Sequence, residues 1–174
     1  MNIYDYYKNI EKMASVIRTK TKKIYKESSD IRDYLEKLVI LFGGKVIINK
    51  EETKTSYGCL MNKDNSFEII LPFLSSPLHD NFYIAKGLGD FLLFNENGKE
   101  KFLPSVRPAM GNLHSNRFAT SLLMPKQEFK KALKNIGEDF SLLAKHFSVA
   151  ENFVKSRYQN LTSTIILENG QKVR

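Results

Sequence analysis

The chain contains few histidine or cysteine side chains that could hold a zinc ion. Its three histidines are His79, His114 and His146, and Cys59 is its one cysteine. A single cysteine excludes both an intramolecular disulfide and a cysteine-rich zinc finger. Asp90 and His114 could each ligate zinc, but two protein ligands are too few for a zinc site. His79 lies about 16 Å from Asp90 by helical rise, which is too far to complete the set.

Lys86 and Asp90 are four residues apart in a segment, about His79 to Phe94, whose apolar residues have the spacing of a buried helix stripe. Residues at this spacing share a helix face, so the Lys86 ammonium and the Asp90 carboxylate can form an ion pair. His114 could add a hydrogen bond to Asp90. The alternative is that Lys86 and Asp90 are both solvated, in a cleft that Gly87 leaves open.

Two segments carry a recognisable pattern of scaffold residues, Ala85-Lys-Gly-Leu-Gly-Asp-Phe-Leu-Leu93 and His114-Ser-Asn-Arg-Phe-Ala-Thr-Ser-Leu-Leu-Met-Pro125. In this order they resemble two motifs of the ImmA/IrrE family of metallopeptidases, A-H-E-L-G-H-x-L-L and E-A-N-x-F-A-x-x-L-L-M-P. The matching residues are Ala85, Leu88, Gly89, Leu92 and Leu93 in the first segment, and Asn116, Phe118, Ala119 and Leu122 to Pro125 in the second. The resemblance covers about residues 30–161.

The residues that perform chemistry in that family do not match. In H-E-x-x-H, two histidines bind one zinc ion and the glutamate between them activates a water molecule. Lys86 stands at the first histidine, Gly87 at the glutamate and Asp90 at the second histidine, while His114 replaces the glutamate ligand of the second motif. A protonated lysine has no lone pair for a metal, and glycine has no side chain to act as a base. The resemblance therefore implies a zincin-like metallopeptidase scaffold with no intact catalytic residue and no zinc cofactor.

Active members of the family that this chain resembles are regulatory proteases. They cut helix-turn-helix repressors and are often encoded by mobile elements or stress loci. The resemblance thus implies a catalytically inactive regulatory protein that binds a protein partner, for example such a repressor. Two other functions stay open. One is an active zinc peptidase with unusual ligands, Asp90 and His114 among them, which the missing side chain of Gly87 argues against. The other is a DNA-binding regulator.

An excess of basic residues keeps the DNA-binding alternative in view. The chain has 27 Lys and Arg against 19 Asp and Glu, a net charge of +8, and such a balance favours acidic partners or nucleic acid. Candidate contacts lie in a basic N-terminal run and in a helix-turn-helix-like segment at 140–161: Lys20, Lys22, Lys23, Lys155 and Arg157. The alternative for the basic N-terminal run is a solvated helix face. The alternative for residues 140–161 is a helical pair that belongs to the fold.

The remaining pattern predicts an α+β fold, with a small, mostly antiparallel sheet packed with a helical bundle. Apolar spacing predicts helices near 3–26, 31–42, 79–94, 113–124, 126–135, 139–146 and 149–161, and strands at 45–48, 58–61 and 66–71. The last two strands are expected to form a hairpin, and residues 165–167 a frayed or strand-like tail. We expect a basic N-terminal helix at 1–28 and a metallopeptidase-like domain at 29–174, with a helical C-terminal part at about 126–161.

Length and hydropathy bound the class of protein. The 174 residues suit one domain, or one domain with a small appendage. No apolar run reaches the roughly 18–20 residues that span a bilayer, and the first residues lack the pattern of a signal peptide. We therefore expect a cytoplasmic protein without a membrane partner.

Overall fold

A computed structural model describes residues 3–50, 57–94 and 111–171. The elements of this part of the chain are α1 (Ile3–Lys20), α2 (Lys22–Glu27), α3 (Ile31–Leu41), β1 (Gly44–Ile48), β2 (Gly58–Met61), β3 (Phe67–Leu71), α4 (Pro77–Leu93), α5 (Gly111–Leu123), α6 (Lys126–Ile136), α7 (Phe140–Phe147) and α8 (Glu151–Gln171). The α+β class predicted from the sequence is confirmed.

The sheet has the strand order β1-β3-β2. The predicted hairpin is confirmed, since β2 pairs with β3 in antiparallel register, with Cys59 opposite Ile69. β1 pairs with β3 in parallel register, with Gly44 opposite Phe67, so the sheet is mixed and not mostly antiparallel. Strand β3 buries Phe67, Ile69 and Leu71. The strand with the most deeply buried side chains takes the centre, which makes β1 its second neighbour, and β1 runs in the same direction as β3.

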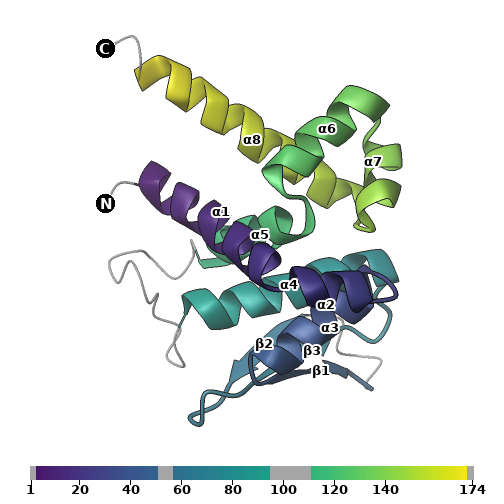
Figure 1. The fold of residues 1–174 in the computed structure, drawn as a ribbon. Coiled ribbons are helices and arrows are strands. Elements are labelled where there is room, and N and C mark those ends of the chain that lie inside the picture. The colour runs from purple at the N-terminus through teal and green to yellow at the C-terminus, as the bar shows by residue number, and fades with distance from the viewer. Residues whose placement is uncertain (1–2, 51–56, 95–110, 172–174) are drawn as a thin grey trace.

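The elements form successive layers (Figure 1). Helices α3 and α4 pack against the sheet, α5 packs against α4, and α1 packs against α5. The helices α6, α7 and α8 lie beyond α5, and α8 contacts both α5 and α7. Helix α4 thus lies between the sheet and α5, and most of its residues from Asn81 to Gly89 are buried.

Local signals define several helix ends. The Asp30 side chain caps α3 by accepting a hydrogen bond from the Asp33 amide, and Ser76 caps α4 with Pro77 in its first turn. After α3, Gly43 has a φ of +82°, which glycine adopts without the steric strain of a side chain.

Two predictions about helices were wrong. The N-terminal helix is divided at Thr21, whose buried hydroxyl bonds to the Ile17 carbonyl at 2.7 Å and to the Tyr34 hydroxyl at 2.9 Å. The tail around residues 165–167 is helical and continues α8 to Gln171. None of the helices in the described ranges is long and apolar enough to cross a bilayer.

Candidate functional site

Helix α4 carries the ion pair that the sequence predicts. The Lys86 Nζ atom donates to Asp90 Oδ2 at 2.9 Å, and the two side chains are 10% and 16% exposed. They lie on one face of the helix because they are four residues apart. The ion-pair prediction is confirmed. The alternative of two solvated side chains is wrong, since both are largely withdrawn from water.

Tyr57, just before β2, completes this cluster. Its hydroxyl donates to Asp90 Oδ2 at 2.6 Å, and the Lys86 ammonium lies 4.4 Å from the centre of its ring. The ring also stacks on that of Tyr83, with centroids 5.3 Å apart. The ammonium therefore interacts with a carboxylate and with the electron-rich face of an aromatic ring, both of which stabilise a cation.

The protonation of Tyr57 and Cys59 leaves the cluster without a ready nucleophile. Burial, with the neighbouring charge of Asp90, strongly raises the pKa of the Tyr57 hydroxyl. Burial, again with Asp90, raises the pKa of the Cys59 thiol to about 12. Cys59 instead donates a long hydrogen bond, 3.6 Å, to the Gly87 carbonyl. Both groups are protonated at neutral pH, whereas the reactive form of a cysteine is the thiolate.

Gly87 lies against the sheet, next to a side chain of β3. A Cβ atom added to Gly87 would come within 2.6 Å of Cγ1 of Ile69, a fully buried residue of β3. No Cβ atom tolerates so close a contact without movement of its neighbour. The side chain of Ile69 thus occupies the space that a glutamate at position 87 would need.

His114, on α5, is a core residue packed against α1. It is fully buried, with its ring 4.6 Å from that of Tyr6 and 5.8 Å from that of Tyr7. Burial, with the charge of Arg117, lowers the pKa of the imidazole. Tyr57 and Lys86 both donate hydrogen bonds to the Asp90 carboxylate. The hydrogen bond from His114 to Asp90 stays a prediction.

The donor set at this site does not fit zinc. Within the described ranges, no three His, Cys, Asp or Glu side chains lie close enough together to hold a metal ion. The Lys86 ammonium is directed at the Asp90 carboxylate, where a metal would have to bind. His79 is engaged elsewhere, because its Nδ1 atom lies 2.8 Å from Ser76 Oγ at the start of α4, and His146 packs edge-on against Phe147.

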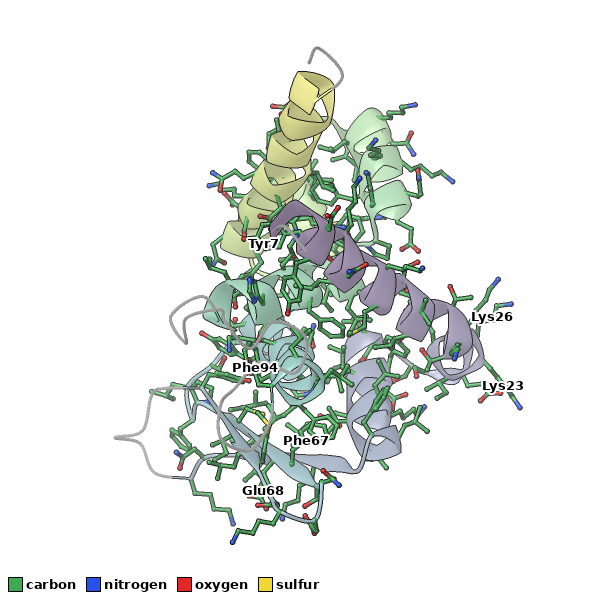
Figure 2. The ribbon with its side chains drawn as sticks, turned by 90° about the vertical axis from the view of Figure 1, so that its left-hand side faces the viewer. Tyr7, Lys23, Lys26, Phe67, Glu68 and Phe94 are labelled. Carbon is green, nitrogen blue, oxygen red and sulfur yellow. The ribbon has the colours of Figure 1, made fainter. Side chains whose placement is uncertain are left out.

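The candidate nucleic-acid contacts divide into exposed and buried residues. Lys20, Lys22 and Lys23 are exposed at the end of α1 and on α2, and Figure 2 shows Lys23 pointing away from the body of the molecule. Lys155 is also exposed, and pairs with Glu151 at 2.7 Å. Arg157 is fully buried, so its predicted role in contacting nucleic acid is wrong.

Arg157 instead joins α8 to α1 and α5. Its guanidinium donates to both carboxylate oxygens of Glu11, to Ser121 Oγ at 3.1 Å and to the Met124 carbonyl at 2.9 Å. Burial raises the pKa of Glu11, but the hydrogen bond and charge of Arg157 outweigh burial and leave that pKa below its usual value. Sequence reasoning missed Glu11, although it lies one residue after buried Ile10.

The helix-turn-helix-like pair of α7 and α8 packs against α4. Ser148, in the turn, adopts a left-handed conformation with a φ of 54°. Its carbonyl accepts a hydrogen bond from Asn81 Nδ2 at 2.8 Å. Phe153, in the first turn of α8, stacks on Phe82 with centroids 3.5 Å apart. A recognition helix contacts DNA with its N-terminal residues. In α8, one side of this N-terminal end packs against the rest of the fold.

This layered arrangement of a small mixed sheet and helices is a metallopeptidase-like scaffold. The chain belongs to the family Peptidase_M78, whose shared unit is the IrrE N-terminal-like domain, and the match covers residues 42–159. This range is more than half of the chain, and the family predicted from the two motifs is confirmed. Searches of curated proteins and of solved structures gave no match.

Proposed function

We propose that this protein is a catalytically inactive member of the IrrE N-terminal-like family that acts by binding a protein partner. The observation that carries the proposal is the packing at Gly87, where Ile69 occupies the space of the general base. The Lys86–Asp90 ion pair supports it independently, because an ammonium group at the first ligand position competes with any metal cation.

Zinc peptidases need both a metal that polarises the scissile carbonyl and a base that activates water. Lys86 and Asp90 neutralise each other, and Gly87 offers no base. Tyr57 and Cys59 do not replace it, because the pKa of each group is raised. An active peptidase with unusual ligands has less support than the inactive reading.

The partner we favour is a helix-turn-helix repressor, which an inactive protein would sequester or shield from a working protease. This choice rests on the family and not on a contact in this chain. The net charge of +8 favours a partner with an acidic surface.

The test uses the repressor encoded closest to the gene, mixed with the purified full chain and zinc. Size-exclusion chromatography measures complex formation, and mass spectrometry measures cleavage. The expected result is a complex that contains intact repressor. Zinc-dependent fragments of the repressor would overturn the claim of inactivity, and separate elution of the two proteins at micromolar concentrations would overturn the choice of partner.

A DNA-binding regulator is the second candidate, and the exposed lysines Lys20, Lys22 and Lys23 favour it. Against it stand the burial of Arg157 and the packing of Phe153 on Phe82. These contacts remove a basic group and one face of α8 from any DNA interface. Lys155 remains exposed but pairs with Glu151.

A further inference from the structure

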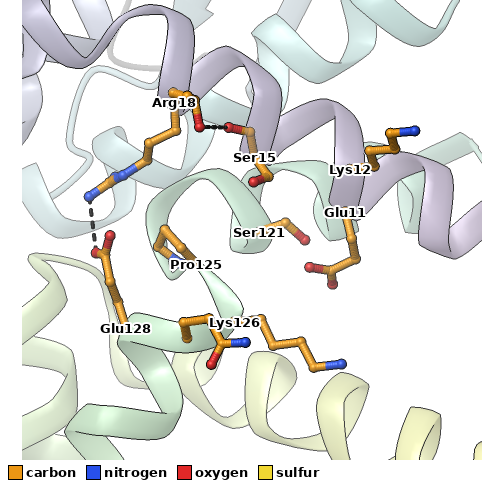
Figure 3. A pocket seen from close by; sticks show the side chains of 10 residues that line it. Glu11, Lys12, Ser15, Arg18, Ser121, Pro125, Lys126 and Glu128 are labelled. Atoms are coloured by element: carbon orange, nitrogen blue, oxygen red, sulfur yellow. Dashed lines mark hydrogen bonds and ion pairs between the residues drawn. The ribbon is translucent and has the colours of Figure 1, made fainter.

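A groove runs between the N-terminal helices and the junction of α5 and α6, away from the Lys86–Asp90 cluster. Its first part is a hollow of about 410 Å³, lined by α1 from Glu11 to Thr19 and by residues from Ser121 to Glu128. Figure 3 shows α1 on one side of this hollow and the α5–α6 junction on the other. A second hollow of about 360 Å³ continues along α1 and α2 to Lys26. Both are lined by Arg18, Thr19 and Glu128, and we call them together the α1–α6 groove.

The charges inside the groove do not cancel. Glu11 is neutralised by the buried guanidinium of Arg157, and Arg18 pairs with Glu128 at 3.2 Å. Four further cations line the groove, and the structure gives none of them a carboxylate partner among the described residues: Lys12, Lys22, Lys26 and Lys126. The groove therefore presents an excess of positive charge to a ligand.

The helices on either side of the groove are joined by hydrogen bonds, and polar side chains line it. Arg18 donates to the Leu122 carbonyl at 3.1 Å as well as to Glu128, so it ties α1 to α5 and α6. Ser15 and Gln127, both exposed, line the first hollow and supply hydrogen-bonding groups. In the second hollow the ring of Tyr25 is 42% exposed and lies under the Arg18 guanidinium, 4.4 Å away. A ligand finds cations, amide and hydroxyl groups, and one aromatic surface.

Glu128 favours a peptide over a nucleic acid as the ligand. Its side chain is 56% exposed and borders both hollows. Although Glu128 Oε2 accepts from Arg18, a carboxylate has acceptors and no donor to offer a ligand. A phosphate backbone along the groove would also present acceptors and could not donate to Glu128. A peptide can place its acidic side chains on the lysines and a neutral backbone or an amide beside Glu128. Each hollow is of the size of typical small-ligand pockets, roughly 300–1,000 Å³.

We propose that the α1–α6 groove is a docking site for an acidic segment of a protein partner. The inference rests on the proposed function for the statement that the ligand belongs to a protein. Lys12, Lys22, Lys26 and Lys126 bind its carboxylates, and the polar side chains between them bind its backbone. The groove is built by α1, α2, α5 and α6, so the loss of the chemical site on α4 leaves it intact.

The test measures binding of a fluorescein-labelled decapeptide of alternating glutamate and alanine to the full chain at 0.15 M salt, with fluorescence anisotropy. The variant Lys12→Gln/Lys22→Gln/Lys126→Gln removes three groove cations. The matched control Lys20→Gln/Lys23→Gln/Lys130→Gln removes three exposed lysines outside the groove. We expect the groove variant to bind about tenfold more weakly, from three ion pairs of modest strength, and the control to change affinity by less than about twofold.

Amide chemical-shift mapping with the same peptide should perturb residues along Ser15 to Arg18 and near Ser121. Equal loss of affinity in both variants, perturbations spread over all lysine-bearing faces, or no binding of the peptide would each overturn the proposal. So would a single-stranded thymidine decanucleotide that binds more tightly and displaces the peptide. None of these outcomes bears on zinc content or repressor cleavage, so failure of the groove and failure of the proposed function remain distinguishable.

Discussion

Under the proposed function, Lys86 stands where a metal ligand would be, and a protonated lysine donates hydrogen bonds and has no lone pair to offer a metal. The Lys86 ammonium lies against the Asp90 carboxylate and the Tyr57 ring. The positive charge of this site is therefore the ammonium group of Lys86. Removing one partner of a buried ion pair leaves the other charge without compensation, which destabilises a fold more than loss of the pair does.

We predict strong coupling between Lys86 and Asp90. Lys86→Met and Asp90→Asn should each lower the free energy of unfolding by about 1–3 kcal/mol, less than for a fully buried pair because both side chains keep some solvent contact. The double variant should lose clearly less than the sum of the two single losses. Urea unfolding measures all four proteins. Additive losses would show that the two side chains do not act as a pair.

A second prediction concerns the space at Gly87. Alanine normally stabilises a helix over glycine by roughly 0.5–1 kcal/mol. At position 87 the contact with Ile69 should reverse that sign, and overpacking should cost about 1–3 kcal/mol. In a protein that already carries Ile69→Ala, the further change Gly87→Ala should leave the free energy of unfolding unchanged or raise it.

Thermal or urea unfolding measures these variants, with Gly58→Ala as the control. A Cβ atom at Gly58 would lie 3.7 Å from Ile70, an ordinary contact, so this exchange should have little effect. If Gly87→Ala stabilised the wild-type background, Ile69 would not fill the space beside Gly87.

At the residue level, the sequence predicted what depends on local spacing and missed what depends on tertiary structure. The Lys86–Asp90 pair followed from the helical repeat. The contact of Tyr57 with Asp90 joins residues 33 positions apart, and neither residue carries a local signal of it. Arg157 could have been placed correctly, because it continues the stripe of buried Val154 and Leu161.

At the scale of elements, strands and helix ends were predictable because glycine, proline and capping residues mark them. The strands β1, β2 and β3 begin and end within one residue of the predicted limits. The parallel pairing of β1 with β3 was not predictable, since parallel and antiparallel pairing of these two strands would place the same side chains inward. The division of the N-terminal helix at Thr21 depends on the hydroxyl of Tyr34 in α3, a contact that only the folded chain creates.

The packing of α5 on α1 makes stability depend on pH through His114. Burial and the charge of Arg117 lower the pKa of this imidazole below its ordinary value of 6.5 in the folded state. The unfolded chain therefore takes up a proton that the folded chain does not, as pH falls below 6.5. The stability that neutral His114 contributes is complete above this pH and decreases below it.

We expect the unfolding free energy to decrease from pH 7.5 to pH 5.5, and the slope to be smaller in His114→Gln. The carboxyl of Glu11 titrates in a separate window, below 4.5, because its pKa is also lowered. Denaturant unfolding across the pH range measures the slope. An equal slope in both proteins would contradict the assignment to His114.

At the scale of the whole molecule, the net charge of +8 predicts weak, non-specific attraction to DNA. Duplex binding should weaken steeply with salt, with a log–log slope of several units, and neutralising Lys20, Lys22 and Lys23 should reduce that slope. Neutralising Arg157 should destabilise the fold instead. Fluorescence anisotropy at several salt concentrations measures the slope. A nanomolar, sequence-selective complex at physiological salt would contradict the preference for a protein partner.

The central claim is the proposal that the Lys86–Asp90 ion pair takes the place of a zinc site in this chain. The most direct test is the zinc content of the wild-type protein, purified without chelator, incubated with excess zinc and dialysed against metal-free buffer. Inductively coupled plasma mass spectrometry gives the ratio of zinc to protein. The Lys86–Asp90 pair and the packing of Ile69 at Gly87 predict a ratio well below one, and a stable ratio of about one zinc per chain would contradict the account.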